Sequence, residues 1–121
     1  MLTIGDGQMT AFQAALDQRF VGMATRYLQD TYPRFFGVLP ADEVAGFAAK
    51  TITKGKGYGI TEFADLADFI TATAQLGADF EDEPAFSWAV DILNDKKAPA
   101  QSRVTELLAA IIDYFENEGE A

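Results

Sequence analysis

The sequence contains no cysteine and no histidine. Without cysteine, the chain forms no disulfide and offers no thiolate as a nucleophile or metal ligand. Without histidine, it lacks the side chain that most often performs general acid–base catalysis at neutral pH, which is also the commonest metal ligand. Zinc sites, copper sites and histidine-based catalytic triads are therefore not expected.

Long apolar runs are also missing. No segment approaches the roughly 18–20 apolar residues that span a bilayer. The first ten residues, MLTIGDGQMT, lack the basic stretch and apolar core of a signal peptide. We therefore expect a cytoplasmic protein. The 121 residues, 49% of them hydrophobic, predict one globular domain over residues 1–121, with residues 1–7 and 117–121 frayed.

Basic residues are scarce, and the formal net charge is −10. Residues 79–121 alone hold eleven acids and three bases. Such a surface repels phosphate backbones and anionic lipids, so roles in nucleic-acid or membrane-surface binding are disfavoured. The charge favours a basic protein partner, although a solvated acidic face that keeps the protein soluble explains it equally well.

Helical periodicity is the main pattern that is present. Between Gln8 and Thr31, apolar residues recur every three or four positions, and four further helices are expected near residues 41–53, 61–76, 84–93 and 99–115. The predicted apolar faces are Met9, Phe12, Leu16, Phe20, Met23 and Tyr27; Val44, Phe47, Ala48 and Ile52; Phe63, Leu66, Ala67, Ile70 and Ala74; Phe86, Ala89, Val90 and Leu93; and Val104, Leu107, Leu108, Ile111, Ile112 and Phe115. No strand-like alternation exceeds three or four residues. The sequence predicts an all-α fold, a single small domain of about five helices in an irregular or orthogonal bundle.

A glycine-rich stretch between the second and third expected helices raises the question of a phosphate-binding loop. Such a loop needs Gly, four residues and then Gly-Lys-Ser/Thr, and the sequence KGKGYGIT does not have that spacing. The stretch instead predicts a helix that ends with a left-handed cap at Gly55 or Gly57. A new helix then begins with Thr61 as its N-cap.

The acidic segment from Asp79 to Glu83 is the best candidate for chemistry, because it holds four carboxylates in five residues. An EF-hand needs Gly at position six and Glu at position twelve, where this chain has Pro84 and Val90. We interpret the acids as residues favoured near a helix N-terminus. No constellation of a nucleophile with a base was found, so we predict no catalytic residue, no cofactor and no metal site. Weak binding of a divalent cation by the acids stays open.

Three aromatic residues lie off the predicted core faces: Tyr58 between glycines, Phe80 between acids, and Trp88 out of phase with its helix. Aromatic residues are enriched at binding hot spots, but packing against the core explains each of them equally well. The predicted partner-binding residues are Lys54, Lys56, Tyr58, Asp79, Phe80, Glu81, Asp82, Glu83 and Trp88.

Several short segments carry a resemblance to a known family. They are MLTI with Gln8-Met9, Arg19-Phe20, Tyr58-Gly59-Ile60, LGADF at 76–80, Trp88-Ala89, and ILND at 92–95. In this order they resemble a family of small helical proteins of Gram-negative bacteria, encoded beside spike proteins, PAAR-type tips and toxic effectors of type VI secretion. The resemblance implies a non-catalytic accessory or adaptor protein that binds an effector or spike component. The alternative is an immunity protein that neutralises a cognate toxin.

Overall fold

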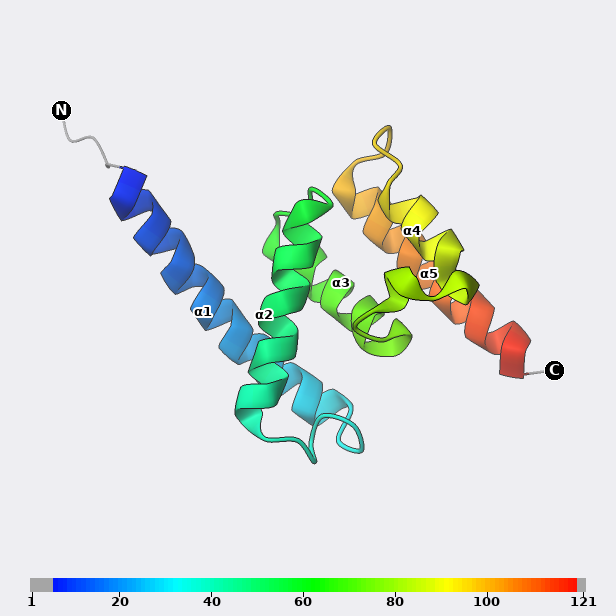
Figure 1. Ribbon diagram of the computed structural model, residues 1–121, viewed down its shortest axis with the longest axis horizontal. Coiled ribbons are helices and arrows are strands. Elements are labelled where there is room, and N and C mark those ends of the chain that lie inside the picture. The colour runs from blue at the N-terminus through cyan, green and yellow to red at the C-terminus, as the bar shows by residue number, and fades with distance from the viewer. Residues whose placement is uncertain (1–5, 120–121) are drawn as a thin grey trace. The chain divides into compact units, whose positions relative to one another are not determined.

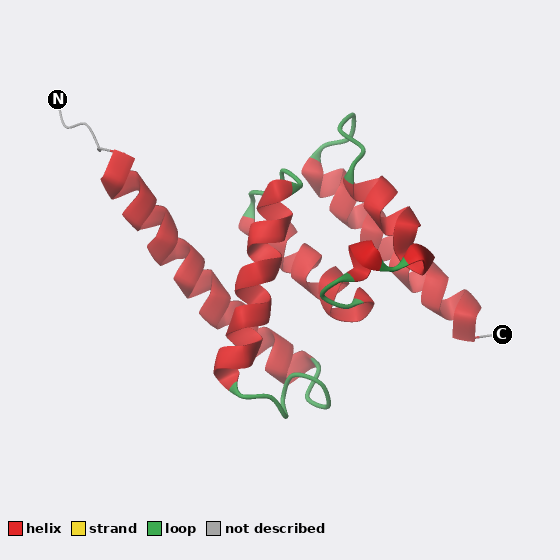
Figure 2. Ribbon diagram, viewed as in Figure 1, coloured by secondary structure: helices red, strands yellow, loops and turns green. Residues whose placement is uncertain are grey.

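The computed structural model describes the backbone of residues 6–119 and the side chains of residues 14–117. Within this part of the chain all regular structure is helical (Figures 1 and 2). The α-helices are α1 (Asp6–Thr31), α2 (Ala41–Gly57), α3 (Phe63–Leu76), α4 (Ser87–Leu93) and α5 (Ala100–Gly119). Two 3₁₀ helices, η1 (Phe80–Asp82) and η2 (Pro84–Phe86), lie between α3 and α4. The predicted all-α fold with five helices is confirmed.

The helices fall into two compact units, divided inside α2 between Ala49 and Lys50. The first unit contains α1, the following loop and the first part of α2. The second contains the end of α2 and all later elements. The assignment of residues 1–121 to one domain stays a prediction. The termini predicted to fray lie partly outside the described residues; α1 begins at Asp6 and α5 continues to Gly119.

Prolines set the boundaries of the first two helices. α1 ends at Thr31, two residues before Pro33, because a proline disfavours helical geometry in the residue that precedes it. α2 begins at Ala41, directly after Pro40, and carries Asp42 and Glu43 in its first turn.

The end of α2 differs from the prediction. Gly55 and Gly57 are both helical, and the left-handed residue is Gly59, with φ 85°. The Ile60 N–H donates to the Gly55 carbonyl at 2.9 Å, and the Gly59 N–H donates to the Lys56 carbonyl at 2.9 Å. These two bonds form a Schellman motif. The predicted cap at Gly55 or Gly57 is therefore wrong by at least two residues.

Gly55 has a different role, which is close packing. A Cβ atom at this position would lie 2.8 Å from Leu66 Cδ2 and 3.0 Å from Phe69 Cδ2, both on α3. Any larger residue at position 55 would require the buried Leu66 and Phe69 side chains to shift. The predicted N-cap of α3 is also wrong. The cap is Glu62, whose side chain makes no capping bond, so Thr61 lies one residue too early.

In the second unit, α5 packs against both α3 and α4, and α4 lies beside α5 in Figure 1. The largest fully buried side chains of this unit are Phe69, Phe80, Ile60, Leu66, Ile70, Leu93, Leu107, Ile111 and Val104. Among the predicted core residues, Leu66, Ile70, Ala89, Leu93, Val104, Leu107 and Ile111 are buried, as are Val44, Ala48 and Ile52 in α2.

Three predicted apolar faces are partly wrong. In α1, Met23 and Tyr27 are exposed whereas Ala24, Thr25 and Leu28 are buried; the side chains of Met9 and Phe12 lie outside the described residues. In α3, Phe63 and Ala67 are exposed and Phe69, Ala72 and Thr73 are buried instead. In α5, Ile112 and Phe115 are exposed. In each helix the buried face is rotated from the one that the most apolar residues define, because neighbouring helices decide which side is covered.

Candidate functional site

Lys54, near the end of α2, is at the centre of a small polar cluster. Its Nζ donates to Glu81 Oε1 at 2.9 Å and to the Ala78 carbonyl, and it lies 5.2 Å from the centroid of the Phe80 ring. Three predicted partner-binding residues are therefore brought together by contacts within the chain. These contacts tie the end of α2 to η1, and because Lys54 and Glu81 are each about a quarter exposed, the ion pair contributes little stability.

Tyr58 adjoins the same cluster. Its ring packs edge-on against Phe69, with the centroids 6.1 Å apart, and its hydroxyl lies 3.5 Å from Glu81 Oε2, the long end of a hydrogen bond. Burial, followed by the charge of the Glu81 carboxylate and its hydrogen bond, raises the pKa of the Tyr58 phenol above its ordinary value. Tyr58 is thus held as a neutral donor at physiological pH.

Arg103 is the polar residue that sequence reasoning missed. Its side chain is only 6% exposed. Its guanidinium donates to three backbone carbonyls: those of Tyr58 at 2.8 Å, Leu93 at 2.6 Å and Ala98 at 3.1 Å. One cation therefore joins the turn after α2, the end of α4 and the approach to α5. The available sequence signal was that Arg103 is the only basic residue of α5.

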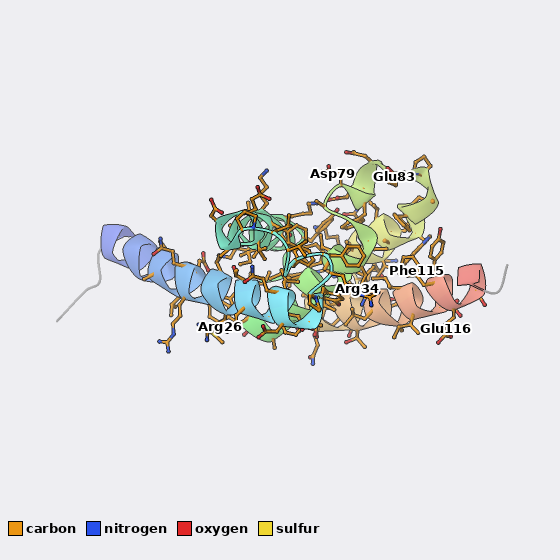
Figure 3. The ribbon with its side chains drawn as sticks, turned by 90° about the horizontal axis from the view of Figure 1, so that it is seen from below. Arg26, Arg34, Asp79, Glu83, Phe115 and Glu116 are labelled. Carbon is orange, nitrogen blue, oxygen red and sulfur yellow. The ribbon has the colours of Figure 1, made fainter. Side chains whose placement is uncertain are left out.

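The acidic turn is divided between the interior and the surface. Phe80 is 1% exposed, so it anchors the turn inside the unit and presents no ring to a partner, contrary to its predicted role. Asp79, Asp82 and Glu83 are exposed, and Asp79 and Glu83 project outward from the turn in Figure 3. Lys56 is half-buried. The binding roles of these charged residues stay predictions.

Trp88 lies in an aromatic cluster where α4 meets the second half of α5. Its ring centroid is 5.4 Å from that of Tyr114 and 6.2 Å from that of Phe86, and its buried Nε1 has no acceptor among the described residues. An open cavity of about 370 Å³ adjoins this cluster. Its lining residues are Trp88, Ile92, Ala110, Asp113, Tyr114 and Asn117. Trp88 was predicted as a binding residue, whereas its α5 neighbours were not.

In the first unit, the loop of residues 32–40 exposes large apolar side chains. Phe35 and Val38 are each 74% exposed, although they lie in a segment with defined internal bonds. The Phe36 N–H donates to the Tyr32 carbonyl at 2.8 Å, and the Phe36 ring packs 5.2 Å from that of Phe47. We refer to residues 32–40 as the apolar loop. Sequence reasoning missed it, although the run FFGVL between two prolines was a usable signal.

Two classes of site are not found in the described part of the chain. No group of three or more acidic side chains is arranged to hold a metal ion there, including those of the acidic turn. No helix among those residues combines the length and the apolar character needed to cross a membrane.

Comparison with known proteins gives no match: no family model, no curated protein sequence and no solved structure is significantly similar to this chain.

Proposed function

We propose that this chain is a non-catalytic protein-binding module. The observation that carries the proposal is the apolar loop, which holds two large hydrophobic side chains in water. Exposing them costs solvation free energy, and that cost is recovered when a partner covers them.

The loop is held in a defined conformation, which lowers the entropic cost of binding. Gln29 Nε2 on α1 lies within hydrogen-bond distance of the Phe36 and Leu39 carbonyls, at 3.4 and 3.3 Å. Gly37 passes so close to Pro33 that a Cβ atom would lie 2.5 Å from the Pro33 carbonyl oxygen. A loop fixed at both positions presents Phe35 and Val38 as ready-made anchors.

The narrower proposal is an adaptor that binds a type VI secretion effector or spike component. Its support is the sequence resemblance alone. The alternative is an immunity protein, which the eleven acids of residues 79–121 favour, because a toxin acting on phosphate-containing substrates is basic around its site.

The test is a tagged pull-down from a lysate of the source organism, comparing the wild-type protein with the double variant Phe35→Ser/Val38→Ser. The control is Arg34→Ser, which shortens an exposed side chain of the same loop without removing apolar surface. We expect a specific partner to be retained by the wild type and by Arg34→Ser. The double variant should recover at least about tenfold less of it, since losing two anchors costs about 1.4 kcal/mol or more.

A second variant, Asp79→Lys/Asp82→Lys/Glu83→Lys, tests the acidic turn in the same experiment. A recovered effector with intact toxicity supports the adaptor, whereas a toxin inactivated in the complex supports immunity. If neither variant changes the proteins recovered, the apolar loop and the acidic turn are not binding surfaces and the proposal fails.

A further inference from the structure

The cavity between α4 and α5 combines aromatic walls with one acidic group. Its volume of about 370 Å³ lies within the range of small-ligand and side-chain binding sites. Trp88 and Tyr114 both line it, and Ile92 and Ala110 add aliphatic surface. Aromatic rings attract cations electrostatically as well as apolar groups, because the faces of the rings carry negative potential.

Asp113 gives this cavity its charge. Its carboxylate is exposed and makes no hydrogen bond or ion pair with any other described residue. No lysine or arginine follows Arg103 in the sequence, and the Arg103 guanidinium is buried against carbonyls. The second half of α5 therefore has no cation of its own to neutralise Asp113.

We propose that this cavity binds the cationic side chain of a basic segment of a partner protein, with arginine preferred. A guanidinium stacks on aromatic rings and also pairs with a carboxylate through two parallel hydrogen bonds. A neutral or acidic occupant would instead leave the Asp113 carboxylate desolvated without a partner. This inference rests on the proposed protein-binding function, since it names the chemistry of the partner.

A second copy of this chain is a poor occupant. Its net charge is −10, and the same face of α5 in a copy carries the same unneutralised acid, so two such faces repel each other. Hydrophobic residues are expected beside the arginine of the partner. Phe115, whose ring centroid lies 5.2 Å from that of Tyr114, is 43% exposed and offers apolar contact; it is labelled in Figure 3.

The experiment uses two peptides of matched shape, acetyl-Leu-Arg-Leu-amide and acetyl-Leu-citrulline-Leu-amide, the second of which is neutral. Binding to the full chain is followed by ¹H–¹⁵N NMR. Trp88 is the only tryptophan, so a single indole resonance reports on the cavity. We expect the arginine peptide to shift this resonance and to bind about tenfold more tightly than the citrulline peptide, from one cation–π contact and one partly exposed ion pair.

Three variants locate the binding. Asp113→Asn, which keeps the shape of the side chain, should reduce the preference for arginine to about twofold or less, and Tyr114→Leu should weaken both peptides. The matched control is Asp68→Asn, which removes the same charge from an exposed residue of α3 that does not line the cavity, and it should behave like the wild type.

Each of three outcomes would overturn the inference. The two peptides bind with equal affinity, the Trp88 resonance does not shift, or Asp113→Asn and Asp68→Asn have equal effects. An indole resonance that moves with protein concentration alone would also overturn it, by indicating a contact between copies of the chain. If the peptides do not bind as expected but the apolar-loop variant still loses its partner, the proposed function stands and only the cavity inference fails. If the peptides bind as expected but the apolar-loop variant keeps its partner, the cavity inference stands and the apolar loop is not the binding surface.

Discussion

Two regions of the second unit use polar groups in opposite ways. Where the end of α2 meets η1 and the start of α5, Lys54, Glu81, Tyr58 and Arg103 bond to one another or to backbone carbonyls. We call this the closed side. Where α4 meets the second half of α5, the Asp113 carboxylate has no partner among the described residues, and Phe115, in ring contact with Tyr114, is 43% exposed. We call this the open side.

The difference shows that charge in the sequence does not by itself mark a binding surface. Some of the lysines and acids near the glycine-rich stretch make contacts within the chain: Lys54 bonds to Glu81 and to the Ala78 carbonyl. Asp113, by contrast, is an unpaired acid in the middle of α5, beside the aromatic residues that line the cavity. Substitutions on the closed side should therefore change stability, whereas substitutions on the open side should change binding.

The largest stability effect is expected at Arg103. Replacing it by methionine keeps much of the side-chain volume but leaves the carbonyls of Tyr58, Leu93 and Ala98 without their donor. We expect the free energy of unfolding to fall by about 3 kcal/mol, because several buried acceptors lose charge-assisted bonds at once. Urea denaturation followed by circular dichroism measures this.

Arg103→Lys serves as a second variant if the methionine form does not fold, and it should lose about 1–2 kcal/mol, since an ammonium lacks the planar fork of the guanidinium. Asp113→Asn, on the open side, should change stability by less than about 0.5 kcal/mol. Comparable losses at Arg103 and Asp113 would erase the distinction between the two sides.

A smaller loss is expected for Gly55→Ala. The added methyl group would lie 2.8 Å from Leu66 Cδ2 and 3.0 Å from Phe69 Cδ2, so these two buried side chains must shift. Overpacking of this kind costs about 1–3 kcal/mol, which exceeds the gain in helix propensity. The control is Gly57→Ala in the same turn, where a Cβ atom has nothing within 4 Å and stability should stay the same or rise slightly. Equal denaturation midpoints for both variants would contradict the close packing of α2 on α3.

The smallest effect concerns pH. Because the pKa of Tyr58 is raised in the folded protein, its contribution to stability is complete below the unfolded pKa of about 10 and is lost as the pH rises toward the folded pKa. In Glu81→Gln the pKa of Tyr58 should fall but stay above its ordinary value, since burial, the largest cause, remains. ¹³C NMR titration of the tyrosine rings, assigned with Tyr58→Phe, measures this. An unchanged pKa would show that Glu81 does not act on Tyr58.

The sequence was a good guide where a local rule decides the structure. Pro33 and Pro40 bracket the first loop because proline restricts its own backbone and that of its neighbour. Gly77, directly after the last apolar residue of α3, ends that helix with φ 108°, which favours glycine. The sequence was a poor guide where two local rules compete. Each of the three glycines within five residues fits a helix cap. The sequence does not reveal that Gly55 lies inside α2 and packs closely against Leu66 and Phe69.

Some residues of the candidate sites could be chosen from the sequence, and others could not. The residues of the Lys54–Tyr58 and Asp79–Glu83 segments were chosen from the sequence, and the structure does bring Lys54, Tyr58 and Glu81 together. Phe80 was wrong as a surface residue, because an aromatic side chain between acids still buries itself when the turn folds inward. The cavity partners of Trp88 were missed because Asp113 and Tyr114 lie more than twenty residues away in the chain.

The sequence by itself determined the helical class, the prolines and glycines at several element ends, and the acidic charge, since each depends on residue type and short-range spacing. Only the tertiary structure decided which face of each helix is buried, that Arg103 is an internal link, and that Trp88 and Asp113 share a cavity. These depend on contacts between segments distant in sequence, where close packing and the need to satisfy every buried polar group select one arrangement among many with the same local pattern.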